Sequence, residues 1–142
     1  MNAKEFLNRA KYLDDLINAK IRQVSQLNDL ATHATSAMTG MPHNPNHGRS
    51  AMADAVVKIV DLQAEINADI DELVDLKRAI LEAVKAVPNG EYQTILERRY
   101  LCFDSWEKIA ADMGYDMRWL YRLHGRAIAA VQEILDASET DH

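Results

Sequence analysis

The feature that most constrains this chain is a series of residues, mostly apolar, spaced alternately by four and three positions over residues 52–87. Its members are Met52, Val56, Ile59, Gln63, Ile66, Ile70, Leu73, Lys77, Ile80, Val84 and Val87. Such spacing keeps the side chains on one face of an α-helix and is typical of a coiled-coil seam. Because the segment holds no Pro or Gly, we expect one helix of about 35 residues, about 50 Å long at the usual rise.

A similar series precedes it and skips one position, which Lys20 occupies. Its members are Phe6, Ala10, Leu13, Ile17, Val24, Leu27, Ala31, Ala34 and Met38. Residues 39–50 between the two series contain two Pro and two Gly, which end a helix and permit a reversal of the chain. We therefore expect a long antiparallel helical hairpin that resembles a coiled coil. Its wide apolar stripes favour a homodimer or a higher homo-oligomer through the hairpin.

Pro88-Asn89-Gly90 ends the second long helix, and three shorter helical segments follow. Asp104, with Glu107 three residues later, has the pattern of a capping box at the start of the second short helix. Gly114 suits a left-handed helix stop, and Asp116 can cap the next helix, which is expected to run to about residue 137. A short helix, a Gly-containing turn of about three residues and a longer helix are the pattern of a helix-turn-helix.

The second helix of such a motif lies in the major groove of DNA. If Leu120 and Leu123 face inward, the outward face presents Met117, Arg118, Tyr121, Arg122, Gly125 and Arg126. Arginine can read guanine or pair with phosphate, and tyrosine can stack or donate to phosphate. Trp119 falls between the faces, so it either packs against the first helix of the module or contacts DNA. His124 is expected on the helix surface.

The stretch from Leu96 to Leu135 resembles region four of bacterial sigma factors. The matching runs are Arg99-Tyr100, Ser105-Trp106-Glu107-Lys108-Ile109-Ala110, Met113-Gly114-Tyr115-Asp116 and Arg122-Leu123-His124-Gly125-Arg126-Ala127-Ile128. With a long helical part ahead of it, the chain looks like the small sigma-like proteins of phages and prophages, related in style to late-operon activators. The resemblance implies that Met117, Arg118, Tyr121 and Arg122 meet the bases or backbone of DNA, and that Ser105 and Trp106 lie against phosphates.

Composition excludes several other classes of protein. The single cysteine, Cys102, rules out a disulfide framework and a multi-cysteine zinc site, and we expect it to be a buried thiol. No apolar run reaches the length of a membrane span, and the N-terminal residues do not form a secretory signal. We see no catalytic constellation, no metal site and no cofactor motif, so we expect a non-enzyme in the cytoplasm of a bacterial host. A net charge of −6 argues against a general polyanion binder.

The sequence therefore predicts an all-α protein with residues 1–87 as the oligomerising hairpin (loop 39–50), residues 88–137 as the helix-turn-helix module, and 138–142 as a polar acidic tail. We expect a sequence-specific transcriptional regulator of a phage or prophage. Its expected partner is double-stranded DNA, with RNA polymerase as a second candidate. Two alternatives remain open. One is a small terminase-like DNA-packaging protein. The other is a protein-interaction module that docks on RNA polymerase.

Overall fold

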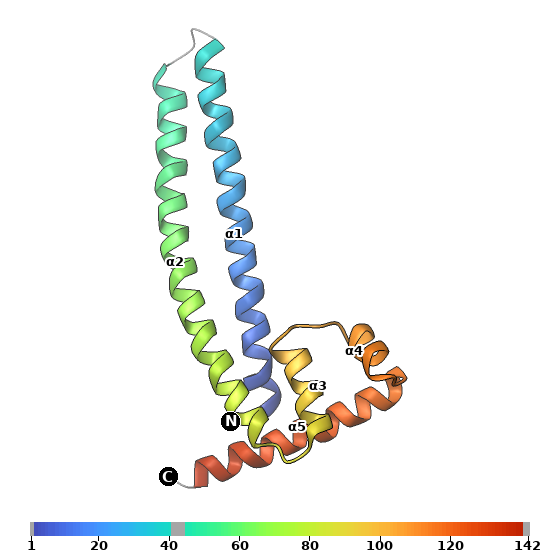
Figure 1. Ribbon diagram of the computed structural model, residues 1–142. Coiled ribbons are helices and arrows are strands. Elements are labelled where there is room, and N and C mark those ends of the chain that lie inside the picture. Colours follow the sequence, from blue (N-terminus) through green and yellow to red (C-terminus); the bar gives the residue numbers. More distant parts are fainter. Residues whose placement is uncertain (1, 41–44, 141–142) are drawn as a thin grey trace. The chain divides into compact units, whose positions relative to one another are not determined.

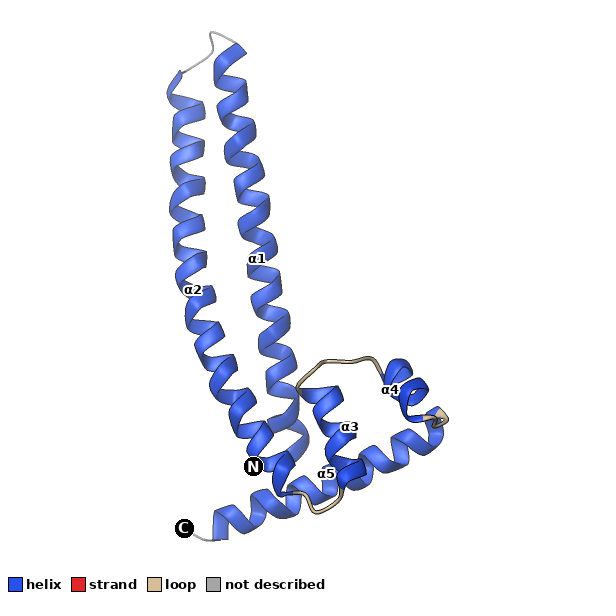
Figure 2. Ribbon diagram, in the orientation of Figure 1, coloured by secondary structure: helices blue, strands red, loops and turns tan. Residues whose placement is uncertain are grey.

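The computed structural model describes the backbone of residues 2–40 and 45–140, and the side chains of residues 2–33 and 50–140. Over these residues the chain forms five α-helices and no strand, so the predicted all-α class is confirmed (Figure 2). The helices are α1 (Ala3–Gly40), α2 (Pro45–Ala86), α3 (Gly90–Tyr100), α4 (Trp106–Met113) and α5 (Met117–Thr140). Within the described ranges, no helix is both long and apolar enough to cross a membrane.

Several helices are longer than the sequence predicted. The expected loop covered residues 39–50, but α1 continues to Gly40 and α2 begins at Pro45. Proline fits the first position of a helix because no N–H donor is needed there and its fixed φ angle is already helical. At the other end of the chain, α5 continues to Thr140, past the expected end near residue 137.

The residues group into two compact units, and the smaller one covers residues 14–72. In this two-helix unit, the middle parts of α1 and α2 lie side by side and run in opposite directions (Figure 1). Lys20, the polar position of the first series, donates from Nζ to Asp69 Oδ2 at 2.6 Å. That hydrogen bond raises the pKa of Lys20 above its ordinary value. Lys20 Nζ also lies 4.0 Å from Glu65 Oε1. Contacts between a polar position of α1 and carboxylates of α2 favour one register of the two helices.

The inward face of α2 agrees with most of the predicted series and differs from it at three positions. Val56 and Ile70 were predicted in the seam, but they are 49% and 41% exposed, and Gln63 is also exposed. The buried and half-buried positions are Ala55, Ile59, Leu62, Ile66, Asp69 and Leu73, which also follow steps of four and three. The helix thus carries two regular stripes that share Ile59, Ile66 and Leu73 and whose mean directions differ by about 50° around its axis. Spacing alone does not distinguish them, because only the contact with α1 selects which stripe is buried.

The second unit comprises the described residues of 1–13 and 73–142, and we call it the core unit. Its main hydrophobic core brings together the start of α1, the end of α2, α3 and α5. Fully buried side chains in this core are Ala3, Leu7, Ala10, Ile80, Val84, Val87, Leu96, Ala127 and Val131. The backbone N–H of Ala3 donates to Gln132 Oε1 at 2.7 Å, so residues 129 positions apart in the sequence close this core.

The loop between α3 and α4 is tied to the rest of the core unit by Phe103. Its φ angle of 59° lies in the left-handed region, which is uncommon for a residue other than glycine. The Nζ atoms of Lys11 and Lys77 lie 5.3 and 4.6 Å from the centroid of its ring, so two cations contact this aromatic side chain. Cys102, next to Phe103, was predicted to be buried, but it is exposed. The buried position at this end of α3 is filled by Tyr100.

Candidate functional site

Helix caps define the turn between α4 and α5. Gly114 ends α4 in the left-handed conformation, with a φ angle of 73°, and its N–H bonds back to carbonyls of α4. Asp116 Oδ1 accepts a hydrogen bond from the backbone N–H of Trp119 at 2.8 Å, which caps the start of α5. The predicted roles of both residues are confirmed. Since α4 ends at Met113 and α5 begins at Met117, a turn of three residues joins them.

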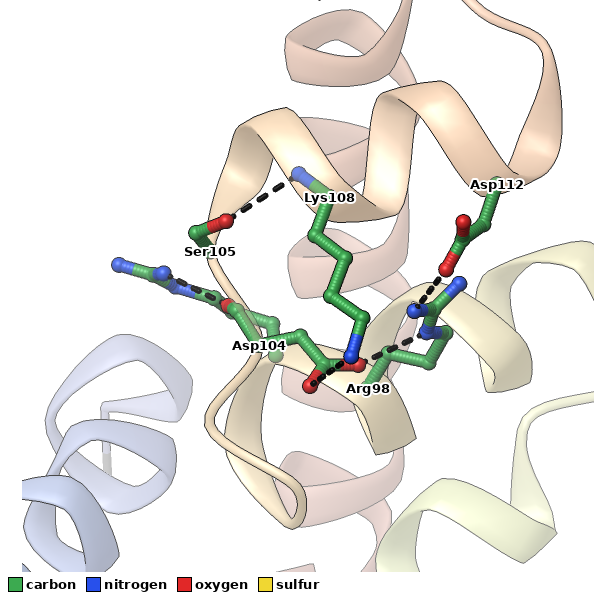
Figure 3. Close-up of polar contacts among 6 residues, drawn as sticks. Arg98, Asp104, Ser105, Lys108 and Asp112 are labelled. Atoms are coloured by element: carbon green, nitrogen blue, oxygen red, sulfur yellow. Dashed lines mark hydrogen bonds and ion pairs between the residues drawn. The ribbon is translucent and has the colours of Figure 1, made fainter.

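The predicted cap at the start of α4 is wrong. Ser105, and not Asp104, is the N-cap, because its Oγ accepts the backbone N–H of Lys108 at 3.1 Å. The Asp104 carboxylate instead accepts from Arg98 Nε at 2.9 Å and lies 3.9 Å from Lys108 Nζ. Arg98 also contacts Asp112, and Figure 3 shows its guanidinium between the two carboxylates. Hydrogen bonds to Asp112 and Asp104 raise the pKa of Arg98, so this cation is already paired within the protein.

A small apolar core holds α3, α4 and α5 together beside the turn. Its buried members are Ile95, Ile109, Ala110, Leu120 and Leu123, and the last two bury the inward face of α5 as expected. Met117 is half-buried and packs against this core. The side chain of Met117, one of the residues expected to meet DNA, is therefore partly taken up by packing.

The outward face of α5 carries four of the other expected DNA contacts. Arg118, Tyr121, Arg122 and Arg126 are all exposed, Tyr121 at 49%. The arginines follow one another at four-residue steps, so they are neighbours along one side of the helix. Within the part of the chain that the structure describes, neither Arg118 nor Arg122 forms an ion pair. No acidic residue occurs in the sequence between positions 117 and 130, so this side of α5 is locally basic.

Trp119 lies at the surface beside these arginines. It is 37% exposed, and the guanidinium of Arg126 lies 5.6 Å from the centroid of its ring. This distance is within the range of a cation–π contact. Arg126 therefore contacts a neutral ring, and it forms no ion pair with any residue that the structure describes.

Trp106, predicted near phosphates, lies where α3, α4 and α5 meet. Its ring makes edge contacts with His124 at 4.5 Å and Tyr121 at 5.5 Å between centroids. The guanidinium of Arg99 lies 4.5 Å from the same ring, and Arg99 also donates to the backbone carbonyl of Asp104 at 3.0 Å. These contacts make Trp106 a packing residue that supports the side of α5 on which Tyr121 lies.

His124 is half-buried, and the prediction of a surface residue is wrong. The Tyr100 hydroxyl lies 2.6 Å from its Nε2, and the two rings stack. Burial, together with the charges of Arg99 and Lys4, lowers the pKa of His124 to about 4. The imidazole is therefore neutral near pH 7. It can accept from the tyrosine hydroxyl when its own proton is on Nδ1.

The described residues contain no group of three or more His, Cys, Asp or Glu side chains placed to hold a metal ion. No protein-family model matches the sequence, and comparisons with curated proteins and with solved structures give no significant match.

Proposed function

We propose that this chain is a sequence-specific DNA-binding regulator, with α4 and α5 as a helix-turn-helix of the sigma region-four type. In this proposal, α5 enters the major groove and Arg118 and Arg122 contact guanine bases or phosphates. The proposal includes the expected setting of a phage or prophage regulator in the bacterial cytoplasm. It assigns no catalytic role to any residue.

The observation that carries the proposal is the contrast between two groups of arginines. Arg98 is paired with carboxylates, and Arg99 is packed against Trp106, so both support the fold. Arg118 and Arg122 lie in the first two turns of α5, are exposed, and have no carboxylate partner among the described residues. Residues near the start of the second helix are those that reach base edges in helix-turn-helix proteins. The unpaired cations are therefore at the positions where this mode of binding needs them.

The net charge of the chain favours a DNA contact confined to a few residues over a general attraction to DNA. The chain as a whole carries a net charge of −6, so DNA is repelled by most of its surface. Binding must then depend on the few residues of α5, and each phosphate that an arginine neutralises contributes about −0.9 to the slope of log affinity against log salt. Three arginines predict a slope of about −2 to −3, which is small for a DNA-binding protein.

The test is selection from a pool of random-sequence DNA duplexes with the full-length protein, followed by fluorescence anisotropy on the selected duplex at two salt concentrations. The double variant Arg118→Ala/Arg122→Ala should bind at least about 30-fold more weakly, at about 1–3 kcal/mol per base-reading arginine. Its salt slope should be less steep by about 1 for each arginine that contacts a phosphate.

The matched control is Arg22→Ala/Arg78→Ala, which removes two exposed arginines from α1 and α2 and changes the net charge by the same amount. It should retain the affinity and salt slope of the parent protein. Equal weakening in both double variants would mean that net charge and not the α5 surface controls binding. Failure to select any duplex at low salt would contradict the proposal.

A second candidate function, docking on RNA polymerase, is favoured by one observation. Trp119 and Tyr121 are exposed aromatic residues beside the arginines, at 37% and 49%. Exposed Trp, Tyr and Arg are the residue types that dominate protein–protein hot spots. This function predicts that Trp119→Ala weakens binding to purified polymerase, measured by biolayer interferometry, while Arg22→Ala leaves it unchanged.

A further inference from the structure

The two-helix unit leaves one regular face of α2 without a partner among the described residues. Val56, Val60 and Ile70 are 49%, 57% and 41% exposed, and Gln63 and Asn67 lie between them in exposed positions. These five residues, which we call the outer stripe, follow steps of four, three, four and three. They extend for about 21 Å along the helix, given a rise of 1.5 Å per residue. The spacing is that of a surface that packs against another helix.

The outer stripe is also free of charge, although the helix around it is not. Seven charged side chains occur between residues 54 and 72, and none of them occupies a stripe position. Depletion of charge at the centre of an exposed apolar patch is characteristic of the core of a protein interface. Solvated helix faces, in contrast, carry most of the charged residues of a helix.

The order of residues in the stripe indicates what covers it. Four of its five residues, Val60, Gln63, Asn67 and Ile70, form the pattern apolar, amide, amide, apolar, which reads the same in both directions. Against an identical helix, parallel or antiparallel, apolar side chains therefore meet apolar ones and amides meet amides. Each amide carries both donors and acceptors, so two amides facing each other can satisfy one another. A two-fold contact requires this self-complementarity.

Electrostatics restricts where two copies can meet. Residues 14–72 hold nine Asp or Glu and four Lys or Arg, so two copies of this unit repel each other across most of their faces. Contact along the uncharged stripe brings the fewest like charges together.

We propose that the outer stripe is the contact between two copies of this chain, with Gln63 and Asn67 paired as amides at its centre. The contact adds a second α2 beside the first and makes a bundle of four long helices from two chains. This inference concerns a surface separate from α5 and does not depend on DNA binding.

The test measures the dimer dissociation constant of the full-length protein by sedimentation equilibrium. Substitutions at two adjacent valines serve as a matched pair. Val56→Glu places a carboxylate in the stripe of both copies, and the dimer dissociation constant should rise by about 100-fold or more. Val57→Glu makes the same change at the next residue, whose side chain is 59% exposed and lies about 100° further around the helix. It should leave the dimer dissociation constant within about threefold of the parent value. Circular dichroism of each variant checks that the helices persist.

Asn67→Val is the second variant, and it keeps the proposal testable if Val56→Glu does not fold. Removing a polar residue from a helix–helix contact should tighten the association or allow larger assemblies, because the amide limits stability and selects one arrangement. Circular dichroism and reversible sedimentation distinguish this tighter association from aggregation of a misfolded chain. A monomeric parent protein at all concentrations would overturn the proposal. So would equal effects of the two valine changes, or dissociation caused by Leu30→Glu on α1 and not by Val56→Glu.

Discussion

Acid should destabilise the core unit through His124. The direction of this change in stability follows from the pKa of His124. The folded protein holds this pKa at about 4, below the ordinary value of 6.5, so folding favours the neutral ring. The contribution of His124 to stability is complete above pH 6.5. It decreases as the pH falls from 6.5 towards 4 and does not change further below that. The charged ring would lose its acceptor role towards Tyr100 and would face the cation of Arg99.

The size of the effect follows from the same values. A difference of about 2.5 between the unfolded and folded pKa corresponds to at most about 3.4 kcal/mol. Because the ring is only half-buried, solvent screens part of the interaction, and we expect about 1.5 kcal/mol between pH 7 and pH 4.

Urea denaturation at pH 7, 5 and 4, followed by tryptophan fluorescence, measures this loss. The ring of Trp106, one of the two tryptophans, lies 4.5 Å from that of His124, so this part of the signal reports on the same place. His124→Gln removes the titrating group and should lose about 1.5 kcal/mol less than the parent protein over this range. His33→Gln, at an exposed histidine of α1, should behave as the parent protein does. Identical pH dependence of His124→Gln and the parent would refute the assignment to His124.

Three further predictions concern the elements that position α5, and urea denaturation at pH 7 measures each. Ser105→Ala should cost about 1 kcal/mol through loss of the cap of α4, whereas Ser105→Thr should cost much less. Gly114→Ala should cost about 1–2 kcal/mol because its φ angle of 73° is unfavourable for a residue with a Cβ, and a neutral result would mean that the turn adopts another conformation. Leu120→Ala should cost about 2–5 kcal/mol because this side chain is fully buried in the small core, and a cost below 1 kcal/mol would show that α5 is not packed there.

Features set by neighbours in the sequence were predictable. The helical class follows from apolar spacing, and the roles of Gly114 and Asp116 follow from local rules for helix ends. The cap of α4 was not predictable in the same way, because Asp104 and Ser105 are adjacent and both residue types can cap. What decides between them is the attraction of Asp104 to Arg98 and Lys108, which the folded chain brings near it.

Features that depend on tertiary contact were missed for similar reasons. Spacing identified α2 as a helix but did not show whether Val56 or Ala55 faces α1, because both belong to regular stripes. For His124, sequence spacing predicted a position on the helix surface. It does not indicate the hydroxyl of Tyr100, 24 residues earlier, that makes the position half-buried. The contacts that fix α5 therefore come mostly from residues distant in sequence.

The closure of the core unit by Ala3 and Gln132 has a consequence for the newly made chain. The first turns of α1 leave the ribosome long before Gln132, because 129 positions separate Ala3 from Gln132 in the sequence. Until then Leu7 and Ala10 lack the partners that α5 contributes to the finished core. A fragment cut at residue 88, the boundary that the sequence suggests, would expose Leu96 and Val131 in the same way. A nascent or shortened chain of this kind is a natural substrate for chaperones and proteases.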